Sequence, residues 1–280
     1  MMEGKTVVIT GATSGIGFET AMELAGKGAR IVGLGRSDAA GERLLNQLNA
    51  LNNNAVHAFY KVDLSSQDSI RSVAKELNSD LEKIDVLINN AAGVFSKYTE
   101  SVEGIEMQWA TNHIAYFLLS NLVLEKVKAS PSGRIVNVSS KAHLRGDINW
   151  DNPELKGEYN VTDAYAQSKL SNVLFTRALA RRLEGSGVTA NCLHPGLVKT
   201  RIGNKHSNPI HGFLWSIITF FGISRKDGAE TSVYLASSPE VEGKTGDYYD
   251  KCQIAEVHPL ANDQDAQERL WKLSETYVQN

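Results

Sequence analysis

The sequence has few cysteines, little excess charge and no apolar stretch long enough to cross a membrane. Its two cysteines, Cys192 and Cys252, cannot supply a framework of several disulfides in a chain of 280 residues, so a reducing compartment is expected. The formal net charge of -3 argues against a basic surface for nucleic acid. We therefore expect a cytoplasmic protein that does not bind nucleic acid.

Targeting and membrane signals are also lacking. The first residues lead directly into a strand-like segment, without the apolar core of a signal peptide. The most apolar stretch elsewhere, residues 213–222, is shorter than the ~20 apolar residues that a membrane-spanning helix needs. We expect neither a signal peptide nor a spanning helix.

What the sequence does contain is a regular alternation of apolar strand-like segments and amphipathic helical segments. This alternation predicts an α/β fold: a doubly wound, Rossmann-type parallel sheet with helices on both faces, forming one domain over residues 1–280. The predicted strands lie near 5–10, 30–35, 56–62, 86–90, 134–139 and 188–194, and the predicted helices near 16–25, 39–51, 66–78, 111–127, 165–183 and 263–278.

A glycine-rich turn follows the first predicted strand and begins the first predicted helix. Glycines allow a close approach of the backbone to a pyrophosphate, and the free amides of a helix N-terminus face its negative charge. The spacing is G-x-x-x-G-x-G, so an ordinary glycine-rich turn stays an alternative. The candidate phosphate-binding residues are Gly11, Thr13, Ser14, Gly15, Ile16 and Gly17.

The end of the second predicted strand bears on the choice between NAD and NADP. Folds that prefer NAD place an acidic side chain there for the ribose 2′-hydroxyl. Here the strand ends in Arg36 and Ser37, and a planar guanidinium suits a 2′-phosphate. The sequence thus favours NADP(H) over NAD(H), with a solvated surface arginine as the alternative. Asp63 and Leu64, at the end of the third strand, are candidates for the adenine site, unless Asp63 only starts the next turn.

Tyr165 and Lys169 stand four residues apart at the start of a predicted helix, so they share one face. A nearby ammonium stabilises a phenolate and would lower the tyrosine pKa from its usual ~10. Such a pair can exchange a proton with an alcohol or carbonyl oxygen. Ser139 and Ser140 end a buried strand, where a hydroxyl can reach the same oxygen, although turn serines and surface pairs are common alternatives.

Taken in order along the chain, these motifs resemble the short-chain dehydrogenase/reductase family over nearly the whole length. The long gap between Ser140 and Tyr165 is similar to the retinol-dehydrogenase-like branch of that family. One departure is Ala92, which separates the usual Asn-Asn-Ala motif from Gly93 and can shift this loop. The motifs that carry the resemblance are Thr10-Gly11-x-x-x-Gly15-x-Gly17, Asn89-Asn90-Ala91, Ala110-Thr111-Asn112-His113, Ser140, Tyr165-x-x-x-Lys169-Leu170-Ser171-Asn172 and Leu193-His194-Pro195-Gly196.

The resemblance implies a catalytic role for four residues. Tyr165 would be the acid/base, Lys169 would lower its pKa and bind the nicotinamide ribose, and Ser140, rather than Ser139, would polarise the substrate oxygen. Asn112 would hold a water that extends the proton relay. The implied cofactor contacts are Asn89, Ala91, Pro195, Gly196, Val198 and Thr200, and no metal ion is expected.

The resemblance also bears on substrate and partners. Residues 199–225 fall where the family places a substrate lid, and their aromatic content suggests a hydrophobic small-molecule substrate, either retinol-like or another aldehyde or ketone. Residues 213–222 could instead make a weak membrane contact or an interface. Family habit implies a homodimer formed by helices near Asn112 and Tyr165.

The predicted function is an NADP(H)-dependent oxidoreductase that transfers hydride between nicotinamide and a hydrophobic alcohol or carbonyl compound. The alternative is a non-catalytic NADP(H)-binding regulatory protein, which would be expected to lack the tetrad Asn112, Ser140, Tyr165 and Lys169. A sugar-nucleotide epimerase or dehydratase would show a G-x-x-G-x-x-G turn, which is absent here.

Overall fold

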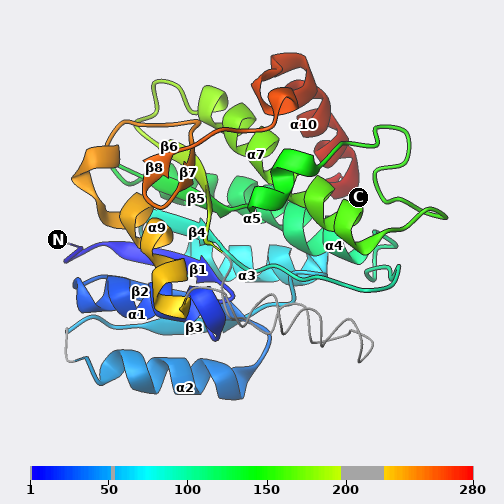
Figure 1. Cartoon of the computed structure of the whole chain (residues 1–280). Helices are drawn as coiled ribbons and strands as arrows, with labels where there is room; N and C mark the ends of the chain where they lie inside the picture. Colours follow the sequence, from blue (N-terminus) through cyan, green and yellow to red (C-terminus); the bar gives the residue numbers. More distant parts are fainter. Residues whose placement is uncertain (1, 52–53, 197–223, 280) are drawn as a thin grey trace.

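The computed structural model describes residues 2–51, 54–196 and 224–279, and within them one eight-stranded sheet forms the core (Figure 1). The strand order is β3-β2-β1-β4-β5-β6-β7-β8, and all neighbours are parallel except β7 and β8. The strands are β1 (Thr6–Thr10), β2 (Arg30–Gly35), β3 (Ala58–Lys61), β4 (Val86–Asn89), β5 (Arg134–Val138), β6 (Thr189–His194), β7 (Tyr248–Asp250) and β8 (Gln253–Ile254).

Helices cover both faces of this sheet, as the sequence predicts for a doubly wound fold. On one face α1 (Gly15–Gly26), α2 (Asp38–Asn49) and α9 (Arg225–Ser237) bury apolar side chains against the strands. On the other face lie α3 (Gln67–Asp80), α5 (Ala115–Leu122) and α7 (Val161–Arg182). Every residue of β1, β4 and β6 is buried. This burial explains the mainly apolar sequences of β1 and β4. The predicted fold class is confirmed.

The direction of winding reverses between β1 and β4. From β1 the chain proceeds to β2 and β3 on one side, and it returns to β4, β5 and β6 on the other. In open parallel sheets a crevice forms at the carboxyl ends of the strands where the order reverses, and ligands bind there. A ligand site is therefore expected at the ends of β1 and β4.

The structure divides one predicted helix, 111–127, into several pieces. These are α4 (Met107–Trp109), a π-helical turn η1 (Ala110–Ile114), α5 and α6 (Leu124–Lys128). A π turn inserts one residue into a helix and does not disturb its apolar pattern enough to be visible in the sequence. At Val123 the backbone departs from helical angles, with φ -105° and ψ 7°, and this separates α5 from α6.

The helix that carries Tyr165, α7, begins earlier than predicted. Asn160 accepts hydrogen bonds from the backbone amides of Thr162 and Asp163 and so caps α7. Tyr165 therefore lies inside α7, one turn from its start, rather than at the helix terminus.

The C-terminal helix α10 (Gln264–Val278) packs across the outer side of α5 and α7. The Trp271 ring contacts the Phe117 and Phe175 rings, with centroids 4.9 and 5.8 Å away. The helices for which family habit implied a dimer thus carry α10 on their outer side (Figure 1). Short 3-10 turns complete the described fold at Lys141–Arg145, Pro239–Val241 and Pro259–Asn262.

Among the described residues, no helix has the length and apolar character that crossing a bilayer would require. The predicted lid, residues 199–225, lies outside the described residues except for Ser224 and Arg225, which begin α9.

Candidate active site

A crevice of about 920 Å³ opens at the carboxyl ends of β1, β2, β4 and β5. It runs from the ends of β3 and β2, past the glycine-rich turn that follows β1, to Tyr165 and Lys169. Predicted site residues from four separate parts of the sequence therefore share one cavity.

The turn at the start of α1 has the backbone that the glycine motif predicts. Gly11 and Gly15 adopt φ values of +68° and +61°, in the left-handed region that favours glycine. A Cβ on Gly17 would lie 2.4 Å from Asn90 Nδ2 and 2.5 Å from the carbonyl oxygen of Gly11. Two of these glycines are thus required by conformation and the third by close packing.

The N-terminus of α1 is prepared to receive an anion. The N-cap Ser14 makes no side-chain hydrogen bond to the helix amides, and the first turn contains no acidic residue. The first amides of a helix lack partners within the helix and carry the positive end of its dipole. Thr13, Ser14, Gly15 and Ile16 all line the crevice at this point. This cradle fits the pyrophosphate of a dinucleotide.

The structure corrects the prediction for Asn89. Its side chain is fully buried and donates to Asn137 Oδ1 at 2.8 Å and to Ser120 Oγ at 2.9 Å, inside the fold. The next residues, Asn90 and Ala91, line the crevice instead. Successive residues of an extended segment face opposite sides, so the contact moves by one position.

Arg36 lies where the prediction placed it, at the end of β2. It lines the crevice together with Gly35, Asp63 and Leu64. The hydroxyl of Ser37 accepts a hydrogen bond from the Ala40 amide at 3.3 Å and so forms the N-cap of α2. Asp63 Oδ1 accepts hydrogen bonds from the Ser65 amide at 3.0 Å and from the Ser65 hydroxyl at 2.7 Å. These bonds agree with the alternative interpretation, in which Asp63 starts a turn.

Tyr165 and Lys169 both line the crevice from α7, as their spacing predicts. Lys169 is fully buried, and its Nζ donates to the carbonyl oxygen of Val138 at 2.9 Å and lies 5.7 Å from the centre of the Tyr165 ring. Burial without a carboxylate partner lowers the pKa of Lys169 to about 7.

The pKa of Tyr165 differs from the prediction. Burial of the hydroxyl raises it above the usual value, while a hydrogen bond with Ser140 and the charge of Arg145 act in the lowering direction. The expected lowering by Lys169 is not found, because burial also disfavours the charged form of that lysine.

The two serines at the end of β5 have different roles. Ser139 is buried, and its hydroxyl donates to the carbonyl oxygen of Lys169 at 2.7 Å. Ser140 accepts from the Ala142 amide at 3.2 Å, and its hydroxyl hydrogen bonds with Tyr165. Ser140 is therefore the serine with a hydroxyl beside the phenol.

Asn112 is also brought to this site, but its side-chain amide is already engaged. Oδ1 accepts from the Gly93 amide at 2.8 Å, while Nδ2 donates to the Gly93 carbonyl at 2.9 Å and to Ser168 Oγ at 3.2 Å. The amide thus holds the crevice wall at Gly93, and the water that the resemblance implied for Asn112 stays a prediction.

Comparison with known proteins identifies the family. A family model described as short chain dehydrogenase matches residues 5–210. This chain belongs to the short-chain dehydrogenase family. Human "Retinol dehydrogenase 14" is 42% identical over 99% of this chain and 87% of its own length. Human "Retinol dehydrogenase 11" is 40% identical over 98% of this chain and 85% of its own length.

Solved structures agree with this membership. An uncharacterized protein from Mycobacterium paratuberculosis superposes with a TM-score of 0.78 at 32% identity, over 100% of this chain and 95% of that one. A blue fluorescent protein from a metagenomic library, solved in complex with NADPH, gives a TM-score of 0.70 at 26% identity, over 88% of this chain and 96% of that one.

Membership fixes the coarse function of this short-chain dehydrogenase. The chain is a retinol-dehydrogenase-like oxidoreductase that transfers hydride and binds a nicotinamide dinucleotide.

The crevice also has a wall that the sequence analysis did not identify, because its residues belong to no motif and only the folded chain brings them together. These residues are Val94, Phe95, Ser96, Lys97, Thr99 and Met107.

The remaining predicted contacts of this dehydrogenase lie near the end of β6. Pro195 lines the crevice, and Gly196 adopts a φ of +84°, which favours glycine. Val198 and Thr200 lie outside the described residues, so their predicted contacts stay predictions.

Proposed function

We propose that this short-chain dehydrogenase interconverts a hydrophobic alcohol and its carbonyl compound, with Tyr165 as the acid/base and NADP(H) as the preferred cofactor. The observation that carries the proposal is the meeting of Tyr165, Ser140 and Lys169 at one end of a crevice whose other parts fit a dinucleotide. This arrangement supports proton transfer at the position where a substrate oxygen would lie.

The bound nicotinamide supplies or accepts the hydride. In the reductive direction the Ser140 hydroxyl donates to the carbonyl oxygen, and Tyr165 Oη transfers its proton to the same oxygen. The raised pKa of Tyr165 keeps this proton in place until the oxygen becomes basic. Lys169, with a pKa of about 7, can hold a positive charge beside the phenol and restore its proton.

The preference for NADP(H) rests on Arg36. Its side chain is exposed at the mouth of the crevice, and no carboxylate follows β2 at the tip of the strand. A guanidinium attracts the 2′-phosphate by charge and by paired hydrogen bonds. The uncharged 2′-hydroxyl of NAD(H) interacts with a guanidinium much more weakly.

The substrate class rests on the crevice wall and on the relatives. Val94, Phe95 and Met107 contribute apolar side chains to this wall. Retinol dehydrogenases 14 and 11, named for an apolar polyene alcohol, share about two fifths of their residues with this chain. We therefore propose an apolar alcohol, aldehyde or ketone as substrate, and from the cysteine content a cytoplasmic location.

A substrate screen tests the proposal. The purified chain is mixed with NADPH or NADH and a panel of aldehydes and ketones that runs from short polar to long apolar compounds, including a retinal, and cofactor oxidation is followed by absorbance. We expect turnover with NADPH that rises with the apolar length of the substrate. The catalytic role would be rejected if the chain bound NADPH but neither reduced any carbonyl compound nor oxidised any alcohol.

A further inference from the structure

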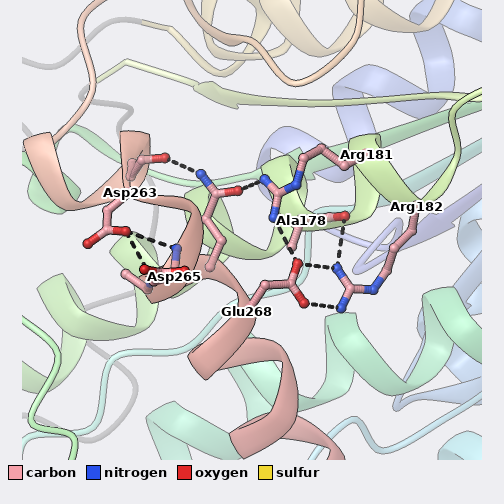
Figure 2. Close-up of polar contacts among 9 residues, drawn as sticks. Ala178, Arg181, Arg182, Asp263, Asp265 and Glu268 are labelled. Atoms are coloured by element: carbon pink, nitrogen blue, oxygen red, sulfur yellow. Dashed lines mark hydrogen bonds and ion pairs between the residues drawn. The ribbon is translucent and has the colours of Figure 1, made fainter.

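Helix α10 is held at both ends by polar contacts, to α7 near its start and to α3 near its end. Near its start, Glu268 accepts from Arg181 at 2.9 Å and from Arg182 at 2.6 Å, and Gln267 contacts Arg181 (Figure 2). These contacts tie the first half of α10 to the end of α7, the helix that carries Tyr165.

The other end of α10 is tied to α3. Gln67 Nε2 donates to the carbonyl oxygen of Tyr277 at 2.7 Å, and the Arg71 guanidinium donates to that of Val278. With both ends held, α10 can serve as a fixed support for what it touches in between.

Between these ends α10 makes one buried polar contact with the π turn. The ring Nε2 of His113 lies 2.8 Å from Ser274 Oγ, and neither side chain is exposed. The Ser274 hydroxyl donates to the carbonyl oxygen of Leu270 at 2.8 Å. Its only hydrogen is thereby used, so the serine oxygen accepts a hydrogen bond from the Nε2–H of His113.

The imidazole is confined on its other sides. Its centroid lies 4.8 Å from that of Trp109 and 6.3 Å from that of Phe175. Burial lowers the pKa of His113 to about 3, against a smaller opposing effect of Asn172. The ring therefore stays neutral at physiological pH and is a fixed donor to Ser274, without the properties of a pH switch.

His113 is the neighbour of Asn112 within the five-residue π turn. Asn112 in turn holds both the amide and the carbonyl of Gly93, which lines the crevice. A continuous series of contacts thus leads from α10 through Ser274, His113 and Asn112 to the crevice wall. Single π turns inside helices are frequent at functional sites, where they redirect a side chain.

We propose that Ser274 and His113 are positioning residues, through which α10 sets the rotation of the π turn and so holds Asn112 and Gly93 in place for turnover. The effect on turnover rests on the proposed oxidoreductase function, whereas the effect on Gly93 does not. Small displacements at an active site can lower the rate by as much as ~100-fold.

The test compares three variants of the full chain. Ser274→Ala removes the acceptor for His113, while Ser274→Thr retains an oxygen at the same position. Thr276→Ala is the matched control, because Thr276 lies on the same helix, is exposed and donates its hydroxyl to the Leu273 carbonyl at 2.7 Å. We expect Ser274→Ala to lower kcat about tenfold, with partial recovery in Ser274→Thr and no loss in Thr276→Ala.

A double-mutant cycle separates positioning from general stability. If Ser274 acts through Asn112, adding Ser274→Ala to Asn112→Ala should lower kcat no further, although it still lowers the melting temperature. The proposal would be overturned if Ser274→Ala lowered kcat by the same factor in the wild type and in the Asn112→Ala variant. A kcat unchanged by Ser274→Ala would also overturn it.

Amide hydrogen exchange provides a readout that does not depend on activity. The Gly93 amide donates to Asn112 Oδ1, so Ser274→Ala should accelerate its exchange while the amides of β1 stay unchanged. Acceleration in a protein with no measurable turnover would reject the proposed function and retain the positioning pair. Unchanged exchange at Gly93 would reject the pair itself.

Discussion

Asn90 donates two hydrogen bonds to Thr10 at the point where the sheet reverses its winding. Asn90 Nδ2 donates to the Thr10 carbonyl at 2.8 Å, and the Thr10 hydroxyl accepts from the Asn90 amide at 2.8 Å. The same hydroxyl accepts from the Ala91 amide at 3.0 Å. The ends of β1 and β4 are therefore locked together directly beneath the glycine-rich turn.

This lock leaves no room for a side chain at Gly17. We predict that Gly17→Ala lowers the free energy of unfolding by about 1–3 kcal/mol and also weakens NADPH binding, because the new methyl group must displace Asn90 or the Gly11 carbonyl. Denaturant unfolding and cofactor titration measure the two effects.

The matched control for that change is Gly26→Ala in the same helix. No atom lies within 4 Å of its added Cβ, and its φ is not positive. We expect this variant to be unchanged or more stable by about 0.4–1 kcal/mol, with normal NADPH binding. Equal behaviour of the two variants would show that the close packing around Gly17 is unimportant.

Removing the phenolic hydroxyl separates binding from chemistry. We predict that Tyr165→Phe lowers kcat by about 100-fold or more and leaves NADPH affinity unchanged, because the hydroxyl is the proposed proton donor while the ring is retained. Steady-state kinetics and NADPH fluorescence measure the two quantities. Tyr234→Phe is the control, since the Tyr234 hydroxyl donates to Glu240 at 3.0 Å, away from the crevice. Near-normal turnover in Tyr165→Phe would assign the proton to another group.

Reversing the charge at Arg36 tests the cofactor preference. We predict that Arg36→Asp weakens NADPH binding by about 10- to 100-fold and NADH binding far less, because a charged hydrogen bond to the 2′-phosphate is lost. Arg43→Asp changes the net charge equally, at an exposed position of α2. If both variants weaken NADPH to the same extent, the effect comes from the overall charge and Arg36 is not at the phosphate.

The fold class and much of the site could be predicted because they depend on local patterns. The buried strands β1 and β4 have mainly apolar sequences, and Tyr165 and Lys169 share a helix face by their spacing alone. The start of α7 was available in the sequence as well, since Asn160 precedes Val-Thr-Asp and is a typical N-cap.

The properties that could not be predicted arise only when distant segments meet. The raised pKa of Tyr165 depends on how deeply the folded chain buries its hydroxyl, and the spacing of the motif holds no information on that depth. The side chain of Asn112 binds Gly93 because η1 and the segment after β4 come together. The π turn that presents Asn112 has no marker such as proline or glycine in the segment Ala110–Ile114.

The buried imidazole of His194 is expected to make the folded protein less stable in acid. Burial, assisted by the charges of Lys141 and His143 and opposed by Asp250, lowers the pKa of His194 to about 4. The unfolded chain therefore binds one more proton than the folded chain between pH 6.5 and 4, so stability falls as the pH decreases through that window. The expected slope is about 1.4 kcal/mol per pH unit for this residue alone.

The substitution His194→Asn keeps an acceptor for the Lys141 amide, which Nδ1 now serves at 3.3 Å, and removes the titrating group. We expect the free energy of unfolding of this variant to depend less on pH between 6.5 and 4 than that of the wild type. His258→Asn is the control, because His258 caps a 3-10 turn through Nδ1 and asparagine is also a good cap. The measurement is urea unfolding at half-unit pH intervals. If His194→Asn kept the wild-type slope, protonation of that imidazole would not contribute to acid unfolding, and the slope would have to come from other buried groups such as His113 and His143.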